Sequence, residues 1–194
     1  MQVELLHLTP DALNSIGDYA GICYNSKRTV EANTKRAVSC VNKGHLATLR
    51  FAHATFHVSG ISRACSHQFV RSKHLDFLQQ SQRYVNQSDN GCVFPPTDHL
   101  GDFGQAYEKA YEMYELLIKK GVKKEDARFV LPEGMMTELV VVGNLQAWLD
   151  FITLRDCKEA QWEIRSVAQE INRQLNNKLP EIFPYVTRSS HSTT

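Results

Sequence analysis

Residues 79–83 read QQSQR and gather amide, hydroxyl and guanidinium groups in one short run. In a β-strand the side chains of alternate residues share a face, so Gln79, Ser81 and Arg83 would point the same way. A guanidinium forms paired hydrogen bonds with phosphate oxygens, and neutral donors satisfy the remaining lone pairs. The run therefore suits the oxyanion of a nucleotide. The alternative is a solvent-exposed edge strand whose polar residues bind nothing.

Further cations lie at the ends of predicted elements. Arg71 follows Gln68 by about one helical turn, so both would face one pocket. Arg128 lies in the last turn of a short predicted helix, and Arg155 ends an amphipathic one. Each cation alone is explained as a surface or helix-capping residue. Together, next to buried segments, they modestly favour a shared anionic ligand.

These residues must be positioned by a mixture of strands and helices. Alternation and β-branched residues predict strands at residues 1–8, 50–60 and 137–144. Helical spacing predicts helices at residues 9–24, 29–43, 61–71, 104–121, 123–132, 144–156 and 158–178. Thr9 and Asn144 are the expected N-caps of two of them, with Pro10 at the first helical position, and residues 92–104 are an expected loop.

The predicted fold is α+β, with a small, twisted, mostly antiparallel sheet flanked by several helices. The chain has 194 residues, of which 42% are apolar, enough for one hydrophobic core. We expect a single domain over residues 1–187 and a disordered tail over residues 188–194.

Composition excludes several classes of function. The 22 basic and 21 acidic residues nearly cancel, so no net field attracts nucleic acid or a membrane surface. No apolar run approaches the roughly 20 residues that span a bilayer, and the N-terminus lacks a signal pattern. We therefore expect a cytoplasmic protein. The five cysteines and eight histidines form neither a C-x-x-C nor an H-E-x-x-H pattern, so no metal site is predicted.

An ordered set of motifs resembles the flavin-dependent thymidylate synthase family. The motifs are GISRACSHQFVR, QQSQRYV, ARFVLPEGMMTELVVVGN, AWLDFITLR and AQWEIR, and they span roughly residues 40–170. The resemblance implies methylation of C5 of dUMP to give dTMP. Methylenetetrahydrofolate would supply the carbon, and reduced FAD, regenerated by NADPH, would supply the hydride. It also implies a homotetramer with its sites at subunit interfaces.

The resemblance assigns roles residue by residue. The residues implied to bind dUMP are Gln68, Arg71, Gln79, Gln80, Ser81, Gln82, Arg83, Arg128 and Arg155. The residues implied to bind FAD are Arg71, Ser72, Lys73, Gln79, Asn144, Gln146 and Asp150. The implied catalytic residues are Arg155, which would stabilise enolate charge on the uracil, and His45, which would lie near the flavin.

The chain departs from the family pattern mainly on the flavin side. The signature R-H-R-x-x-S-x-N-x-x-S-x-R keeps its places at Arg71, Ser81 and Arg83. It is altered at four others, namely Ser72, Lys73, Asp76 and Leu78. Gln146 replaces the arginine of an N-x-R motif, and Asp150 departs from the pattern four residues later. In the upstream G-H-x-S-x-x-E-H motif, the usual serine, glutamate and histidine are replaced by Ala47, Arg50 and Phe51.

Three hypotheses follow. The favoured one is a working enzyme with rebuilt flavin contacts and weakened FAD binding, in which Arg50 restores a cation only if it lies on the flavin wall. The second is alkylation or hydroxymethylation of another pyrimidine nucleotide, such as UMP, because Asp76 and Leu78 alter the signature itself. The third is a catalytically inactive paralogue that still binds the nucleotide.

Overall fold

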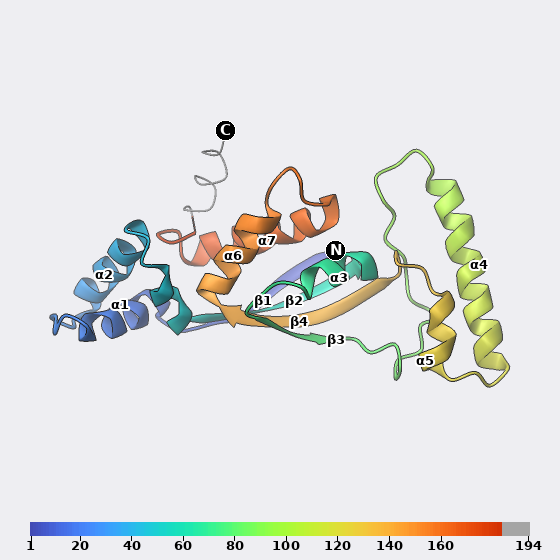
Figure 1. Cartoon of the computed structure of the whole chain (residues 1–194), viewed down its shortest axis with the longest axis horizontal. Helices are drawn as coiled ribbons and strands as arrows, with labels where there is room; N and C mark the ends of the chain where they lie inside the picture. Colours follow the sequence, from blue (N-terminus) through green and yellow to red (C-terminus); the bar gives the residue numbers. More distant parts are fainter. Residues whose placement is uncertain (184–194) are drawn as a thin grey trace. The chain divides into compact units, whose positions relative to one another are not determined.

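The structure is a computed structural model, and it describes residues 1–183 (Figure 1). The predicted tail at residues 188–194 lies outside the described residues. The helices are α1 Ala12–Ile22, α2 Val30–Asn42, η1 Leu46–Phe51, α3 Arg63–Phe69, α4 Leu100–Lys119, α5 Lys124–Ala127, η2 Arg128–Val130, α6 Leu145–Arg155 and α7 Trp162–Lys178, where η marks a 3-10 helix. None of those in residues 1–183 combines the length and apolar character needed to cross a membrane.

Four strands form one sheet in the order β1-β2-β4-β3. They are β1 Gln2–Leu8, β2 His53–Ser62, β3 Leu75–Gln79 and β4 Met136–Asn144. Backbone bonds from Leu145 N to Ala52 O and from Arg63 N to Met135 O lie at the two ends of the β2–β4 pair and make it antiparallel. The predicted α+β class and the three predicted strands are confirmed.

The chain divides into two compact units. Unit 1 comprises Met1–Gln2, Val58–Phe69 and Leu78–Leu139, and unit 2 comprises Val3–His57, Val70–Phe77 and, of the described residues, 140–183. Helices α3, α4 and α5 belong to unit 1, whereas α1, α2, η1, α6 and α7 belong to unit 2.

Helix α6 starts directly after β4 and packs in the core of unit 2. The side-chain oxygen of Asn144 accepts a hydrogen bond from Ala147 N at 2.9 Å, as the predicted cap requires. Trp148 is fully buried; its indole N–H donates to Ala54 O at 3.1 Å, and its ring meets Phe56 edge to face at 4.9 Å. These contacts fix the direction in which α6 leaves the sheet.

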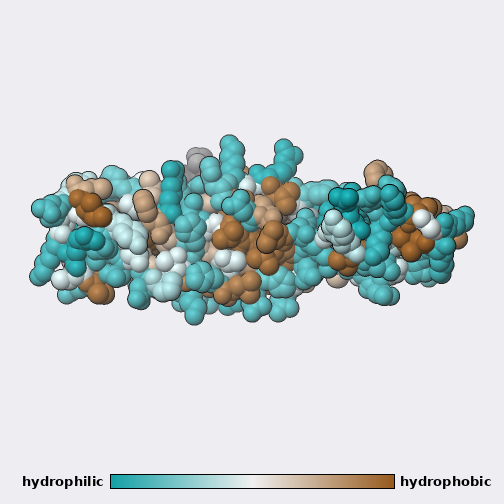
Figure 2. All heavy atoms as spheres, turned by 90° about the horizontal axis from the view of Figure 1, so that it is seen from below, coloured by the Kyte–Doolittle hydropathy of each residue, from teal (hydrophilic) through white to brown (hydrophobic). Residues whose placement is uncertain are grey.

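The two faces of β4 differ in exposure. From Thr137 to Gly143 the odd-numbered residues are buried, whereas the even-numbered residues from Met136 to Asn144 are half-buried or exposed. Val142 on the even-numbered face is 37% exposed. Seen from below the view of Figure 1, the surface of the molecule carries hydrophobic side chains scattered among hydrophilic ones (Figure 2). The even-numbered face of β4 therefore presents apolar surface.

Several predicted boundaries were wrong. Thr9 does not cap the first helix, because its hydroxyl accepts a hydrogen bond from His53 N at 2.9 Å and so joins β1 to β2. Helix α1 instead begins after Asp11, which has a φ of 48° and makes no side-chain cap. Helix α4 begins at Leu100, which shortens the expected loop, and the helix expected over residues 123–132 is the short α5 followed by η2.

Helix α1 lies close against α2 at Gly17, and we predict that Gly17→Ala destabilises the fold. An added Cβ would lie 1.8 Å from the backbone oxygen of Asn33, so one helix must shift. We expect a loss of about 1–3 kcal/mol in the free energy of unfolding. Thermal unfolding followed by circular dichroism would measure it.

The matched control is Gly101→Ala, at the start of α4, where an added Cβ meets no atom within 4 Å. This change should leave stability unaltered or raise it by up to about 1 kcal/mol, because alanine favours helix. Equal melting temperatures for the two variants would contradict the proposed close approach.

Candidate functional site

A pocket in unit 2 brings together residues that lie far apart in the sequence. Its volume is about 180 Å³, and its lining residues are Arg50, His74, Asn144, Gln146, Ala147 and Asp150. Three of them, Asn144, Gln146 and Asp150, belong to the predicted FAD set. The structure therefore brings three of the seven predicted flavin contacts to one cavity.

The junction between β4 and α6 builds one wall of this pocket. Gly143 lies so close to β3 that an added Cβ would be 2.3 Å from Leu75 Cδ2. Just before β3, His74 adopts a left-handed φ of 63°, a conformation that is uncommon outside glycine. The turn that ends at His74 thus supplies a second wall, and η1 supplies Arg50.

The pocket contains charges of both signs. Arg50 Nε donates a hydrogen bond to Gln146 Oε1 at 2.7 Å, which joins η1 to the first turn of α6. Partial burial raises the pKa of the Asp150 carboxyl, and the charges of His74 and Arg50 oppose this shift. A ligand phosphate in the pocket would be attracted by Arg50 and repelled by an ionised Asp150.

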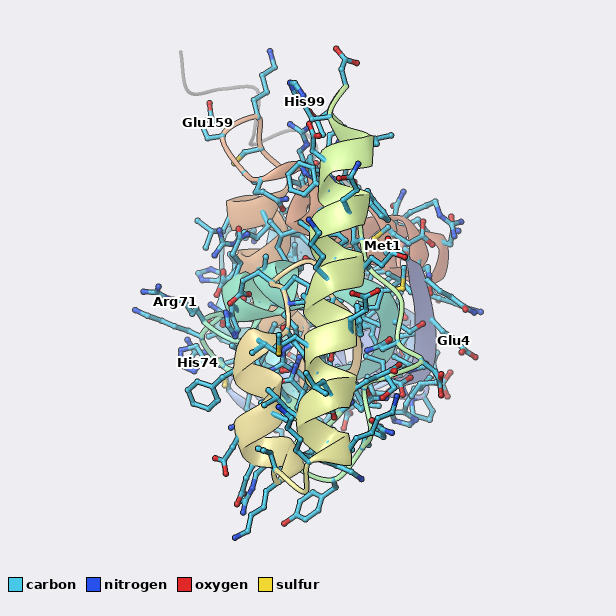
Figure 3. The ribbon with its side chains drawn as sticks, turned by 90° about the vertical axis from the view of Figure 1, so that its right-hand side faces the viewer. Met1, Glu4, Arg71, His74, His99 and Glu159 are labelled. Carbon is cyan, nitrogen blue, oxygen red and sulfur yellow. The ribbon has the colours of Figure 1, made fainter. Side chains whose placement is uncertain are left out.

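The turn between α3 and β3 carries three more predicted flavin residues, Arg71, Ser72 and Lys73, whereas the last one, Gln79, ends β3 in unit 1. Arg71 and Lys73 are exposed, and Arg71 and His74 project on the same side of the molecule (Figure 3). The hydroxyl of Ser72 is buried and has no hydrogen-bond partner within residues 1–183. A buried hydroxyl of this kind is a group that a bound ligand could satisfy.

The two predicted catalytic residues are not among the pocket's lining residues. His45 is exposed and precedes η1; its backbone N–H donates to Cys40 O at 2.8 Å. Arg155 is half-buried and is the last residue of α6, as predicted. Within residues 1–183, no group of three or more histidine, cysteine, aspartate or glutamate side chains is placed to hold a metal ion.

The polar run of residues 79–83 lies in unit 1 and is not a strand throughout. Strand β3 ends at Gln79, and the carbonyl oxygen of Ser81 accepts hydrogen bonds from Tyr84 N at 3.3 Å and Val85 N at 3.0 Å. The chain therefore turns after Ser81. The predicted alternation of Gln79, Ser81 and Arg83 on one strand face was wrong.

Side chains of this run are already held within unit 1. The amide nitrogen of Gln79 donates to Ser66 Oγ at 2.9 Å and to Thr137 Oγ1 at 3.1 Å, which uses both of its hydrogens. Arg83 Nε donates to Glu125 Oε2 at 2.7 Å. These bonds orient the turn before any ligand binds.

The side chains of the two other glutamines of the run also have partners within unit 1. Gln80 Nε2 donates to Glu138 Oε1 at 3.1 Å, and Gln82 Nε2 contacts the sulfur of Met135 at 2.9 Å.

A second pocket, entirely in unit 1, has a volume of about 390 Å³. Its lining residues are Arg63, His67, Gln82, Arg128, Phe129, Leu131, Pro132 and Glu133. Two of them, Gln82 and Arg128, belong to the predicted dUMP set. Gln68 lies in the adjoining helix α3 and is not one of the lining residues.

Two cations share the unit 1 pocket. Burial lowers the pKa of Arg63, Glu133 opposes this effect, and the neighbouring charge of Arg128 adds to it. Arg128 Nε donates to Glu125 O at 3.0 Å, which fixes its guanidinium at the start of η2. An anion between the guanidiniums of Arg63 and Arg128 would relieve their repulsion.

Sequence reasoning missed several pocket residues, namely Arg63, His67, Glu133 and His74. One signal was available, since Arg63 and His67 are spaced i, i+4 and therefore share a helical face. Glu133 and His74 lie in turns, and hydrophobic periodicity does not predict which residues a turn brings to a pocket.

Comparisons with known proteins agree on one family. Residues 4–181 match the family described as thymidylate synthase complementing protein. A flavin-dependent thymidylate synthase of Geobacter sulfurreducens is 37% identical over 198 residues, covering 94% of this chain and 85% of the relative. One of Thermococcus onnurineus is 41% identical over 203 residues, covering 96% and 82%. One of Nitratidesulfovibrio vulgaris is 33% identical over 210 residues, covering 95% and 86%.

We predict that Asp150→Asn stabilises the chain at neutral pH. Because the folded-state pKa of Asp150 is raised above its usual 3.8, ionisation of the carboxyl disfavours the fold as pH rises through the folded-state pKa. The gain should be within about 1 kcal/mol, since solvent screens a partly exposed charge. Melting temperatures at pH 7 and near pH 3 would measure it.

The advantage of the variant should vanish at the lower pH, where the wild-type carboxyl is protonated in both states. Asp98→Asn removes the same charge from an exposed loop of unit 1 and serves as the control. A stabilisation of Asp150→Asn that is equal at both pH values would contradict the electrostatic origin.

Proposed function

Because the chain belongs to the flavin-dependent thymidylate synthase family, we propose that it methylates C5 of dUMP to give dTMP. Methylenetetrahydrofolate supplies the carbon unit, and FAD, reduced by NADPH, supplies the hydride. The observation that carries this proposal is the family match over residues 4–181. The family resemblance drawn from the motifs is thereby confirmed.

In this proposal most of the nucleotide contacts come from unit 1, and Arg71 and Arg155 of unit 2 are the others. Arg63 and Arg128, the two cations of the 390 Å³ pocket, take its phosphate. The mutual influence of their charges supports this assignment, because a phosphate dianion offsets both. Arg83 and Ser81, held in the turn after β3, are further nucleotide contacts, as are Gln68, Gln79, Gln80 and Gln82.

The residues of the unit 2 pocket fit part of FAD. The guanidinium of Arg50 and the amides of Asn144 and Gln146 are suitable donors for phosphate oxygens, and Asp150 is the one unfavourable group. At about 180 Å³ the pocket is smaller than the roughly 300–1,000 Å³ of sites that enclose a whole ligand. We therefore assign only the phosphate-bearing part of FAD to it.

Further flavin contacts are proposed for the turn at residues 71–73 and for Gln79 at the end of β3. Its buried Ser72 hydroxyl is a further group for the cofactor to satisfy, and Arg71 and Lys73 add positive charge. When bound, FAD supplies the hydride that completes the methyl group. Arg155 is proposed to stabilise negative charge on a uracil carbonyl, and His45 to lie beside the flavin.

We also propose that the chain acts as a homotetramer in the cytoplasm, with its sites at subunit interfaces. Exposed apolar residues in each unit support association, because a partner chain would bury them: Val142 of unit 2 is 37% exposed and Leu78 of unit 1 is 78% exposed. The five cysteines are all free thiols, as is usual in a reducing compartment. Light scattering of the purified protein would test the tetramer.

The decisive experiment combines the protein with FAD, NADPH, methylenetetrahydrofolate and dUMP and identifies the product by mass. We expect dTMP. A hydroxymethylated nucleotide, or a product formed only when UMP replaces dUMP, would support the second hypothesis. Nucleotide binding without flavin-dependent NADPH oxidation would support the inactive paralogue and reject the proposal.

We predict that Arg128→Gln and Arg63→Gln each weaken dUMP binding roughly tenfold to a hundredfold, the usual contribution of a hydrogen bond to a charged group. Calorimetry with dUMP would measure the loss. Deoxyuridine, which lacks the phosphate, should bind equally to the wild type and both variants.

Lys120→Gln removes an exposed cation at the end of α4 in the same unit and is the control. It should leave the affinity for dUMP unchanged. If both arginine variants also bind dUMP as the wild type does, the phosphate assignment is wrong.

A further inference from the structure

Arg50 connects two segments that lie 96 residues apart. It is the fifth residue of η1, its side chain is exposed, and its Nε–H donates to Gln146 Oε1 at 2.7 Å. Among the described residues this is its one hydrogen-bond partner, so its two terminal NH₂ groups are left for other acceptors. Both residues line the unit 2 pocket.

The bond also fixes how Gln146 presents its amide. Because Arg50 is a donor, it requires the carbonyl oxygen of the amide, and the NH₂ group of Gln146 is then left to donate elsewhere. Guanidinium and amide together therefore offer a set of N–H donors beside one cavity. A phosphate group needs such a set of donors.

The charge of the pocket depends on Arg50. Three ionisable side chains line it, Arg50, His74 and Asp150, and Asp150 is close enough to the other two for their charges to lower its pKa. Arg50 is the one guanidinium among the pocket's lining residues, and without it no arginine would stand beside the carboxylate of Asp150. Arg50 is therefore the group of this pocket that favours a phosphate, whereas an ionised Asp150 opposes one.

The contact also gives meaning to two departures from the family pattern. The family pattern that the sequence resembles has arginine at position 146 and glutamate at position 50, whereas this chain has glutamine and arginine there. Since the two side chains are hydrogen-bonded, the positive charge has moved across one contact instead of being lost from the wall. The loss at Gln146 and the gain at Arg50 are then one exchange.

We propose that Arg50, oriented by Gln146, is the residue of this chain that binds the phosphate groups of FAD. The inference rests on the proposed function, because it takes FAD as the ligand. It makes Arg50 a cofactor-binding residue and Gln146 both a second donor and the residue that positions the guanidinium.

The test is a fluorescence titration of FAD into four proteins: the wild type, Arg50→Gln, Gln146→Arg, and the double variant Arg50→Gln with Gln146→Arg. We expect Arg50→Gln to weaken FAD binding roughly tenfold to a hundredfold, as for other charged hydrogen bonds. The double variant should regain most of the loss, because it returns the guanidinium to the same wall.

Two further measurements separate a charged contact from a structural one. Raising NaCl should weaken FAD binding to the wild type more steeply than to Arg50→Gln, because salt screens the guanidinium–phosphate attraction. Arg50→Lys, which keeps the charge but not the forked donor, should bind with intermediate affinity. Lys43→Gln, at the exposed end of α2 in the same unit, should behave as the wild type.

Unchanged FAD affinity in Arg50→Gln, from a protein that still forms dTMP, would overturn this inference and leave the proposed function standing. Failure of the double variant to regain affinity would also overturn it, because the charge would not then be exchangeable between the two positions. A wild-type protein that neither binds FAD nor forms dTMP would reject the proposed function together with the inference. Melting temperatures of all variants would confirm that the comparison is between folded proteins.

Discussion

The structure of unit 2 depends on the junction at which β4 becomes α6. One side-chain hydrogen bond, from Ala147 N to Asn144, allows the helix to start within a residue of the strand's end. The indole bond from Trp148 to Ala54 O then fastens the first turn of α6 to β2. The pocket wall is set by this start, because Asn144, Gln146, Ala147 and Asp150 all lie at the junction or in the helix that follows it.

The same constraint explains which parts of the molecule could be predicted from sequence. Strand β4 and helix α6 follow from local signals, namely an apolar run, a capping asparagine and helical spacing. The turn after Gln79 does not, because it depends on two hydrogen bonds to the carbonyl of Ser81 that no side-chain pattern announces. Thr9 was misassigned for a similar reason, since its hydroxyl bonds to a residue 44 positions away.

The site residues, like the elements of the fold, could be predicted only where a local sequence signal positions them. The sequence shows that glutamine replaces the arginine of the N-x-R motif at position 146. It does not show that Arg50 is the hydrogen-bond partner of this glutamine. Arg50 and Gln146 are separated by 96 residues, and only the packing of η1 against α6 brings them together. Asn144 and Arg155, each positioned by a single element, lie on the elements predicted for them. Arg63 and His74 line the pockets although the sequence analysis did not predict them there.

If the pocket holds the FAD phosphates as proposed, the hydrogen bond between Arg50 and Gln146 also makes a substitution at one position depend on the residue at the other. Starting from glutamate at position 50 and arginine at 146, losing the arginine first would leave the glutamate beside Asp150, a wall of negative charge that repels phosphate. Gaining Arg50 first would place two guanidiniums side by side, and a bound dinucleotide with two phosphates compensates their repulsion. Under the proposed FAD assignment, the route through paired arginines keeps a guanidinium on the pocket wall at every step. Its intermediate would resemble this chain with a single change, Gln146→Arg.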